Sequence, residues 1–584
     1  MKLLFDIETD GLDASVIWCL VIQDVDTNQV WEYSPNEIED GVKLLSKAEV
    51  LAGHNIIGFD IPVLEKLTSF KLGSQRIIDT LVLSRLFNPV REGGHSLGMW
   101  GQRLGLAKIE FDQFERYSKE MMEYCKRDVD LNVKVYHALR KESAGFDPKS
   151  IEIENESARI LKDQEAYGFY FDEFKAEMLL ALMREKMSAT QQEVEKVFKP
   201  KIDERYIYRK DNKSGSLAKT GSWDNPKGKG VRLTPDEYEK FVQMPGLFSL
   251  TRKTMVPFNI ASRKQVGEYL QEFGWKPKQF TENGRPVVNE KTLSQIENIP
   301  QADLIKDFLM YQKREAQIKS WLKVLGDDNR VHGFVVPNGT ITGRMTHRDP
   351  NMAQVPNLAS PYGKECRECW TVPTGYKLVG IDASQLELRM LAHYMNDEEY
   401  TNEIINGDIH TANQKLAGLE SRNQAKTFIY ALLYGAGDEK LGTVVGGSAK
   451  DGAGLRQSFF DNLPSFRDLK RRVSTASEKG FLKGLDGRKI FVRSEHSALN
   501  TLLQGAGAIV MKQALLLFEE SISNLKARIV ANVHDEWQVE VHEDFADLVG
   551  ELGVEAIIDA GEVLELKCPL DGEYNVGDNW AETH

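Results

Sequence analysis

Apolar residues along the chain recur with two different periods, and the changes between them divide the sequence into regions. Residues 1–145 alternate short apolar runs with stretches in which apolar residues recur every three or four positions, so we expect alternating strands and helices. A long helical pattern runs from about 150 to 195, and helical patterns resume at Ser262. Residues 331–584 mix both periods. A chain of 584 residues also exceeds the size of a single hydrophobic core, which predicts several domains.

The first strand-like segment, LLFDIETDGL, carries two acids in a mostly apolar run. Asp6 and Glu8 are two residues apart, so a strand places both carboxylates on one face. A solvated edge strand would explain this pair by itself. Two further acids favour a metal-binding role over a solvated strand. Asp60 lies in the apolar run AGHNIIGFDIPVL, and Asp128 follows Tyr124 by four residues on one helix face. Four such carboxylates suit two divalent ions about 4 Å apart.

These residues resemble the DEDD exonuclease superfamily, tyrosine subtype. The resemblance implies that all four acids hold metal ions and that Tyr124 helps to place the attacking water. Because every expected acid is present, we expect an active 3′–5′ exonuclease in this part of the chain.

The segment YKLVGIDASQLELRMLAHYM begins as a strand and continues as a helix, with Asp382 at the junction. Ser384 and Glu387 have capping-box spacing, so the structural interpretation of Glu387 is a helix cap. A second acidic turn lies in ARIVANVHDEWQVEVHED, where two strand-like arms flank His534, Asp535 and Glu536. Turns normally favour Gly or Asn, so acids at this hairpin tip favour metal binding.

The segment SRNQAKTFIYALLYGAG (421–437) predicts an amphipathic helix. Ser421 and Gln424 have capping-box spacing and Gly435 suits the position after the helix end, giving a helix from about Arg422 to Tyr434. At about 100° per residue, one side carries the stripe Arg422, Lys426, Tyr430 and Tyr434. A solvated helix face usually mixes acids with bases, whereas this stripe has no acid. Cations followed by aromatic rings suit a triphosphate followed by a sugar and base.

The net charge of the chain and the local charge of one segment give opposite indications about whether the protein binds nucleic acid. The net charge of −14 argues mildly against it. Residues 199–232, however, hold ten basic residues against four acids and are rich in Gly, Ser and Asn, which predicts a mobile basic loop or a solvated linker. Five scattered cysteines fit a reducing cytoplasm. No uninterrupted apolar run approaches a membrane span, and the acidic start MKLLFDIETD is unlike a signal peptide, so we expect no membrane association or secretion.

The order of an acid after a strand, an Arg-xxx-Lys-xxx-Tyr helix and an HDE hairpin resembles family A, the DNA polymerase I-like polymerases. Further segments are similar to those of the family: NGTITGRMTHRDPNMAQVPN (338–357), GDIHTANQ (407–414), LDGRK (485–489) and NTLLQGAGA (500–508). The similarity extends over nearly the whole chain, and it is greatest to replicative polymerases of short-tailed bacteriophages. The resemblance implies an α/β and α+β multidomain fold, in which an RNase H-like exonuclease domain precedes a right-hand polymerase.

The resemblance also implies domain boundaries. We expect the exonuclease at 1–145, a thumb at 146–330 with a basic insertion near 199–260, a palm at 331–409 and 481–584, and fingers at 410–480.

The roles of the family's residues carry over to matching positions. Two Mg²⁺ ions per active site are implied, with Mn²⁺ as a substitute. The polymerase ligands would be Asp382, the Ala383 carbonyl and Asp535. Arg422, Lys426 and His410 would grip the phosphates, and Lys426 would donate a proton to the departing pyrophosphate.

Other matching residues would contact the sugar, the base and the primer-template. Tyr430 and Glu387 would form a wall against the 2′ position of the sugar, and Tyr434 would stack near the templating base. Family members carry either Tyr or Phe at the position of Tyr430, and Tyr implies ready acceptance of dideoxynucleotides. Contacts to primer-template DNA would come from Arg344, Gln354, Gln504 and His534.

Partners follow from the same resemblance: primer-template DNA, dNTPs, a phage helicase-primase and a single-strand-binding protein, in the cytoplasm of an infected bacterial host. The segment 199–232 lies about where thioredoxin-using relatives carry their partner-binding insertion, but its details match poorly. Host thioredoxin is therefore one candidate partner, and direct contact with DNA phosphates is the interpretation that we favour.

Three alternatives stay open: a single-subunit RNA polymerase, a standalone nuclease with a DNA-binding scaffold, and a non-catalytic replication platform. The exonuclease motifs and Glu387 argue against the first, and the intact cationic stripe argues against the second. No 5′-nuclease domain is expected before the exonuclease, which disfavours a nick-translating repair enzyme.

Overall fold

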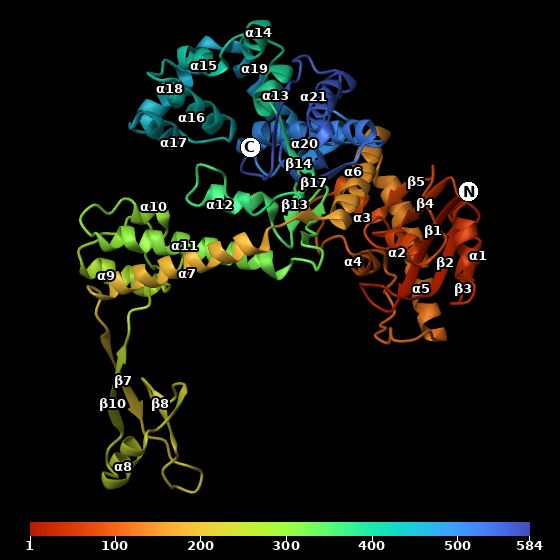
Figure 1. Cartoon of the computed structure of the whole chain (residues 1–584). Helices are drawn as coiled ribbons and strands as arrows, with labels where there is room; N and C mark the ends of the chain where they lie inside the picture. The colour runs from red at the N-terminus through yellow and green to blue at the C-terminus, as the bar shows by residue number, and fades with distance from the viewer. The chain divides into compact units, whose positions relative to one another are not determined.

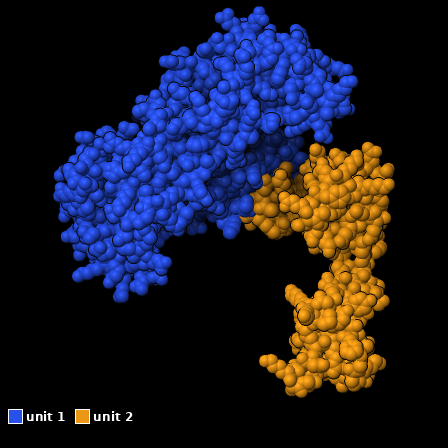
Figure 2. Space-filling view, turned by 180° about the vertical axis from the view of Figure 1, so that it is seen from behind, with its two compact units in different colours: residues 1–175, 320–584 blue, residues 176–319 orange.

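The computed structural model describes residues 1–584, which form two compact units (Figure 2). Unit 1 comprises residues 1–175 and 320–584, and unit 2 comprises residues 176–319. Unit 1 contains two large sheets, each covered by helices, and three two-stranded sheets, so the mixed α/β and α+β architecture agrees with the prediction.

The N-terminal part of unit 1 is built on a five-stranded sheet of order β3-β2-β1-β4-β5 (Figure 1). Its strands are β1 (Lys2–Thr9), β2 (Ile17–Asp24), β3 (Val30–Tyr33), β4 (Val50–Gly53) and β5 (Arg76–Asp79). Its helices are α1 (Ile38–Leu45), α2 (Asp60–Leu67), α3 (Thr80–Phe87), α4 (Leu97–Leu104) and α5 (Lys119–Glu142). The central strand β1 pairs antiparallel with β2 and parallel with β4.

The alternation of side chains along β1 decides which helix covers which face. Phe5 and Ile7 are buried with residues of α1 and α2, whereas Leu4 is buried with residues of α5. Asp6 and Glu8 have the parity of Leu4, so they lie on the face that α5 covers.

The C-terminal part of unit 1 is built on a four-stranded antiparallel sheet of order β17-β18-β14-β19. Its strands are β14 (Tyr376–Ala383), β17 (Ala527–Val533), β18 (Glu536–His542) and β19 (Gly572–Gly577). Helices α20 (Ala498–Ile522) and α21 (Ala546–Val563) share a large apolar core with it. The stretch Glu495–Ile522 has the length and composition of a membrane span, yet 78% of its most apolar window is buried inside the protein.

The remaining elements of this part are mostly helices. They are β11 (Arg330–Val331), β12 (Phe334–Val336), β13 (Thr346–Arg348), η1 (Met352–Gln354), α12 (Gly363–Glu368), α13 (Leu386–Met395), α14 (Glu398–Asn406), α15 (Ile409–Ala417), α16 (Arg422–Leu433), α17 (Asp438–Gly442), η2 (Thr443–Val445), α18 (Ala449–Asn462), α19 (Pro464–Ser477), β15 (Phe481–Lys483), β16 (Lys489–Phe491), η3 (Glu495–Ser497) and η4 (Glu543–Phe545).

Helix α6 (Pro148–Tyr167) links the two large sheets of unit 1 and is followed by the short strand β6 (Phe169–Tyr170). Asn155 of α6 accepts a hydrogen bond from the amide of Asp79 at 2.9 Å. Glu154, one residue earlier, is fully buried and accepts hydrogen bonds from Arg488 and from Lys512 of α20, each at 2.5 Å. The same helix therefore packs on both sheets.

Unit 2 contains a helical part and an appended sheet. The helices are α7 (Glu173–Glu195), α8 (Pro235–Gln243), α9 (Arg263–Glu272), α10 (Glu290–Leu293) and α11 (Gln301–Lys323), with α7 beginning and α11 ending just inside unit 1. The long helices α7 and α11 lie side by side (Figure 1), joined by an ion pair of 3.2 Å between Arg184 and Glu315.

The prediction of a mobile loop at 199–232 is wrong. This segment and its continuation form a four-stranded sheet of order β10-β7-β8-β9, with strands β7 (Lys201–Tyr208), β8 (Thr220–Trp223), β9 (Gly230–Arg232) and β10 (Ser249–Val256). The sheet covers a small core of Ile207, Leu233 and Phe241. Its outer positions are polar, so the apolar alternation that predicts a strand is almost absent from the sequence.

Candidate active sites

The first candidate site is the acid cluster Asp6, Glu8, Asp60 and Asp128. Strand β1 supplies the first two acids, α2 begins with Asp60, and α5 carries Asp128. The Asp60 carboxylate accepts a hydrogen bond from the amide of Ile7 at 3.2 Å, which fixes α2 against β1. The structure therefore brings together the acids that the sequence predicted from three separate segments.

Electrostatics in the acid cluster oppose ionisation. Burial, with Asp60 and Glu8 nearby, raises the pKa of Asp6 well above its usual range. Burial and the charge of Asp128 raise the pKa of Glu8 to about 8. Burial raises the pKa of Asp60 to about 7. One oxygen of Asp128, Oδ1, is buried without a hydrogen-bond partner. Carboxylates that repel one another and lack partners have the character of a site for cations.

One cation that the sequence analysis missed lies at this cluster. Lys108 Nζ is 2.5 Å from Asp128 Oδ2 and 5.0 Å from the ring centroid of Tyr124. Asp128 and Tyr124 raise the pKa of Lys108 above its ordinary value despite its partial burial, so its positive charge is held firmly. Lys108 lies between α4 and α5 in a segment without periodicity, so no sequence pattern marked it.

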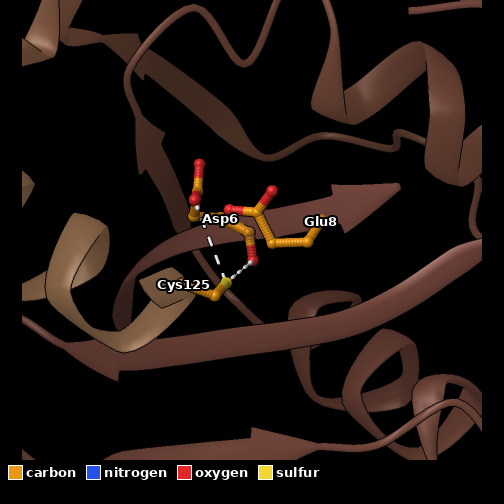
Figure 3. Close-up of side chains that lie close together, drawn as sticks. All are labelled: Asp6, Glu8 and Cys125. Atoms are coloured by element: carbon orange, nitrogen blue, oxygen red, sulfur yellow. Dashed lines mark hydrogen bonds between the residues drawn. The ribbon is translucent and has the colours of Figure 1, made fainter. Parts of the chain in front are cut away.

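A thiol also lies at the acid cluster. The ligand atoms of Asp6, Glu8 and Cys125 are all within 4.8 Å of one another (Figure 3). Cys125 is on α5, one residue after Tyr124, and is fully buried.

The second candidate site surrounds Asp382 and Asp535. Asp382 lies near the end of β14, and Asp535 lies in the turn between β17 and β18. The amide of Ala383 donates a hydrogen bond to the Asp535 carbonyl at 3.1 Å, which holds the two acids beside each other. Burial and the charge of Asp535 raise the pKa of Asp382 to about 7. Burial also raises the pKa of Asp535.

The hairpin that carries Asp535 forms as predicted, with one refinement. His534 adopts the left-handed region with a φ of 58°. Glu536 is not at the tip: it begins β18, is buried, and accepts a 2.6 Å hydrogen bond from the Trp580 indole. Only Asp535 of the two acids is presented to the site.

Helix α16 forms the cationic wall of the same site. The predicted capping box between Ser421 and Gln424 is present, and Gly435 follows the helix end with a φ of 73°. Arg422 forms an ion pair of 2.6 Å with Asp408, which also caps α15. Lys426 has no acidic partner within 4.0 Å, so its charge faces the site uncompensated.

The acids and α16 line one open cleft. Its lining combines two acidic segments, the cationic helix and the loop before β13: Arg344, Asp382, Ala383, Gln385, Leu386, Glu387, His410, Arg422, Lys426, Tyr430, Tyr434, His534 and Asp535. Every predicted nucleotide-binding residue is therefore in this cleft, together with Arg344 and His534. The other two predicted DNA contacts, Gln354 in η1 and Gln504 in α20, do not line it.

The predicted capping role of Glu387 and Ser384 is wrong. Gln385 takes a left-handed φ of 54° and occupies the position before α13, and no side chain caps this helix. Glu387 instead accepts hydrogen bonds from Arg344 at 3.0 Å and from the Tyr434 hydroxyl at 3.0 and 3.1 Å. The Glu387 carboxylate binds donors inside the cleft and therefore does not cap the helix.

The sequence matches a known family over this region. Residues 248–582 match the model of DNA polymerase family A. The chain belongs to this family. This confirms the family expected from the sequence and favours DNA polymerisation over the RNA polymerase alternative.

Individual relatives extend the family A match to the whole chain. The DNA-directed DNA polymerase of Escherichia phage T7 is 35% identical over 702 aligned residues, covering 99% of this chain and 99% of that protein. The DNA-directed DNA polymerase of Enterobacteria phage T3 is 34% identical over 705 residues, covering 100% of both. This protein is thus a phage-related, DNA-directed DNA polymerase of family A.

A solved structure supports the fold of this family A polymerase. The POL domain of Pol1 from M. smegmatis, in complex with DNA primer-template and dNTP, superimposes with a TM-score of 0.77 at 18% identity. The match covers 100% of this chain and 95% of that chain.

Proposed function

We propose that this family A polymerase extends a DNA primer 5′ to 3′ at the cleft and removes mispaired 3′ ends at the acid cluster, replicating a phage genome. The observation that carries the proposal is the cleft itself. Segments far apart in the sequence contribute two adjacent carboxylates, a cationic helix and the pair Tyr430 and Glu387 to the lining of one open cleft.

Both sites suit divalent ions, which family A polymerases use. In the cleft, Asp382, Asp535 and the Ala383 carbonyl would hold two Mg²⁺ ions, with Mn²⁺ as a substitute; in the acid cluster, all four carboxylates would do so. The raised pKa values and the unpartnered Asp128 oxygen support this fit. Such ions would activate the attacking oxygen and neutralise charge on the leaving group.

The cleft residues divide the work along the nucleotide. Arg422, Lys426 and His410 hold the phosphates, and Lys426, free of an acidic partner, protonates the leaving pyrophosphate. Tyr430 and Glu387 close the space beside the 2′ carbon of the sugar. The two hydrogen-bond donors of Glu387, Arg344 and Tyr434, hold that wall in place.

Further residues in and near the cleft would contact the primer-template DNA. Tyr434 stacks near the templating base, and Arg344, Gln354, Gln504 and His534 contact the primer-template. Contacts of this kind position the duplex without reading its sequence.

At the acid cluster, Tyr124 places the attacking water and Lys108 forms an ion pair with Asp128. Burial raises the pKa of Asp128, and the Lys108 charge opposes this rise, which favours the metal-binding state. A frayed primer end reaches this site as a single strand.

The proposed domains keep the boundaries expected from the sequence: exonuclease 1–145, thumb 146–330, palm 331–409 and 481–584, and fingers 410–480. The chain acts in the cytoplasm of an infected bacterial host, with a phage helicase-primase and a single-strand-binding protein. The sheet of residues 201–256 contacts DNA, with thioredoxin as the alternative occupant. Three of the ten basic residues between 199 and 232 are already paired with acids: Lys201, Arg205 and Arg209.

Two variants test the division into sites. Asp535→Ala should abolish primer extension with dNTPs and Mg²⁺ while 3′–5′ degradation persists, and Asp60→Ala should do the reverse. Asp535→Asn keeps the shape of the side chain and serves as the matched control for folding. Normal extension by Asp535→Ala would remove the polymerase assignment, and normal degradation by Asp60→Ala would remove the nuclease assignment.

A further inference from the structure

A cysteine lies among the carboxylates of the acid cluster, where the chemistry of hard divalent ions does not require one. Cys125 Sγ is 3.9 Å from Asp6 Oδ2, and the ligand atoms of Asp6, Glu8 and Cys125 are within 4.8 Å of one another. In Figure 3 the three side chains point toward one another, two from β1 and one from α5.

These separations are close to those of a tetrahedral metal site. Zinc–sulfur bonds of about 2.3 Å and zinc–oxygen bonds of about 2.1 Å, at a tetrahedral angle, place sulfur and oxygen about 3.6 Å apart. A shift of a few tenths of an ångström would bring the Cys125 sulfur and the Asp6 oxygen to that distance. Carboxylate and thiolate together form a donor set that favours ions softer than Mg²⁺.

A fourth donor is available beside these three. Asp128 is on α5 one turn of helix after Cys125 and is 4% exposed, yet its Oδ1 has no hydrogen-bond partner. Asp128 is the candidate fourth ligand beside the three whose ligand atoms lie within 4.8 Å of one another. A buried acceptor without a donor is costly, and a cation would satisfy it.

We propose that Cys125, with Asp6, Glu8 and Asp128, binds a thiophilic divalent cation such as Zn²⁺, Co²⁺ or Cd²⁺. This inference rests on the proposed exonuclease only for its consequence: the bound ion occupies the ligands that Mg²⁺ needs and so inhibits degradation. In the metal-free protein the thiol donates to the Asp6 carbonyl at 3.4 Å. Binding replaces the S–H bond by a sulfur–metal bond and releases that proton to solvent.

Co²⁺ alone is the probe that tests the sulfur ligand, because thiolate ligation gives a charge-transfer absorption that oxygen ligands do not. We expect the intact, reduced chain to develop this band on titration with Co²⁺, and Cys125→Ser to lose it. Two buried thiols serve as matched controls. Cys19, which pairs with Glu8 across β1 and β2, and Cys369, in the Cys-x-x-Cys segment, should keep the band when changed to Ser.

A second variant leaves the thiol in place. Glu8→Gln should weaken Co²⁺ binding by at least about tenfold, since loss of even an outer-sphere partner costs about 10–100-fold. Absence of the band in the wild-type chain, its persistence in Cys125→Ser, or unchanged affinity in Glu8→Gln would each overturn the proposal.

Degradation by the wild-type chain separates this inference from the proposed exonuclease. Mg²⁺-dependent degradation without a Co²⁺ band would overturn the thiolate site alone. A band without degradation would support the metal site and remove the exonuclease. With both present, added Zn²⁺ should inhibit degradation and leave primer extension at the cleft unchanged.

Discussion

The acid cluster and the cleft both hold carboxylates close together, but they offset the resulting repulsion differently. In the acid cluster four acids face one fixed cation, Lys108. In the cleft, Asp382 and Asp535 face a wall that carries Arg422, Lys426 and Arg344. The cluster therefore has an excess of negative charge, whereas in the cleft three cations balance the three acids Asp382, Asp535 and Glu387.

This difference matches the charge of the ligand proposed for each site. A phosphodiester at a primer end carries one negative charge, so divalent ions held by four acids suffice to neutralise it. A nucleoside triphosphate carries several, and protein cations must assist the ions. Charge balance thus distinguishes the two proposed metal sites of the chain better than the number of acids does.

The largest expected effect would act on both sites at once, because α6 packs on both sheets. Glu154→Gln removes the buried acid that pairs with buried Lys512 and with Arg488, and Lys512 is left without an acid because only Arg488 keeps a second partner, Asp486. We expect a loss of about 3–5 kcal/mol in the free energy of unfolding, measured by denaturant titration. Glu156→Gln, on the same helix but in a part-exposed pair with Arg159, should cost about 1 kcal/mol or less. Equal costs for both variants would contradict a structural role for the buried group.

The next largest effect would test the positive wall. Lys426→Met should lower the rate of nucleotide addition by about 10²–10³-fold, the loss typical of one group that stabilises transition-state charge. Arg422→Met should lose less, because Asp408 already offsets part of the Arg422 charge. Single-turnover extension measures both variants. An equal loss, or slower degradation at the acid cluster, would contradict the assignment.

The positions in the fold that the sequence predicted correctly belong to residues with a regular period or spacing. Asp6 and Glu8 follow from the alternation along a strand, and the Ser421 capping box follows from local helix geometry. These rules depend on neighbours in the chain, which a single sequence contains.

The residues that the sequence missed depend on contacts across the fold. Lys108 reaches Asp128 from a segment without periodicity. Glu387 has the spacing of a helix cap, but its true donors, Arg344 and Tyr434, are 43 and 47 residues away. Local spacing could not decide whether Glu387 caps a helix or lies in the cleft, because contacts between distant segments determine which donor its carboxylate binds.

A smaller effect would locate the sugar within the cleft. Tyr430→Phe should discriminate against dideoxynucleotides by about tenfold to a hundredfold more than wild type, the range that one hydrogen bond of about 1.5–3 kcal/mol supplies. Chain termination at a fixed ratio of dideoxy- to deoxynucleotide measures this. Tyr434→Phe is the matched control, because the Tyr434 hydroxyl is already bonded to Glu387. Equal discrimination by wild type and Tyr430→Phe would remove Tyr430 from the sugar site.

The smallest effect would test the single cation of the acid cluster. Burial raises the pKa of Glu8 and of Asp128, and the Lys108 charge opposes both rises, so Lys108→Met should raise both values further. Protonated carboxylates do not bind metal, and the acid limb of degradation should therefore move to higher pH, by about one unit. The profile of rate against pH measures the shift, with primer extension as the internal reference.

Lys126→Met is the matched control for Lys108→Met. Lys126 is on α5, but it pairs with Glu32 and Glu123 and has no partner in the acid cluster. Its loss should leave the acid limb unchanged. If Lys108→Met moved the limb to lower pH, or if both variants moved it equally, Lys108 would not be the cation that keeps these carboxylates ionised. A different cation would then have to offset the negative charge of the acid cluster.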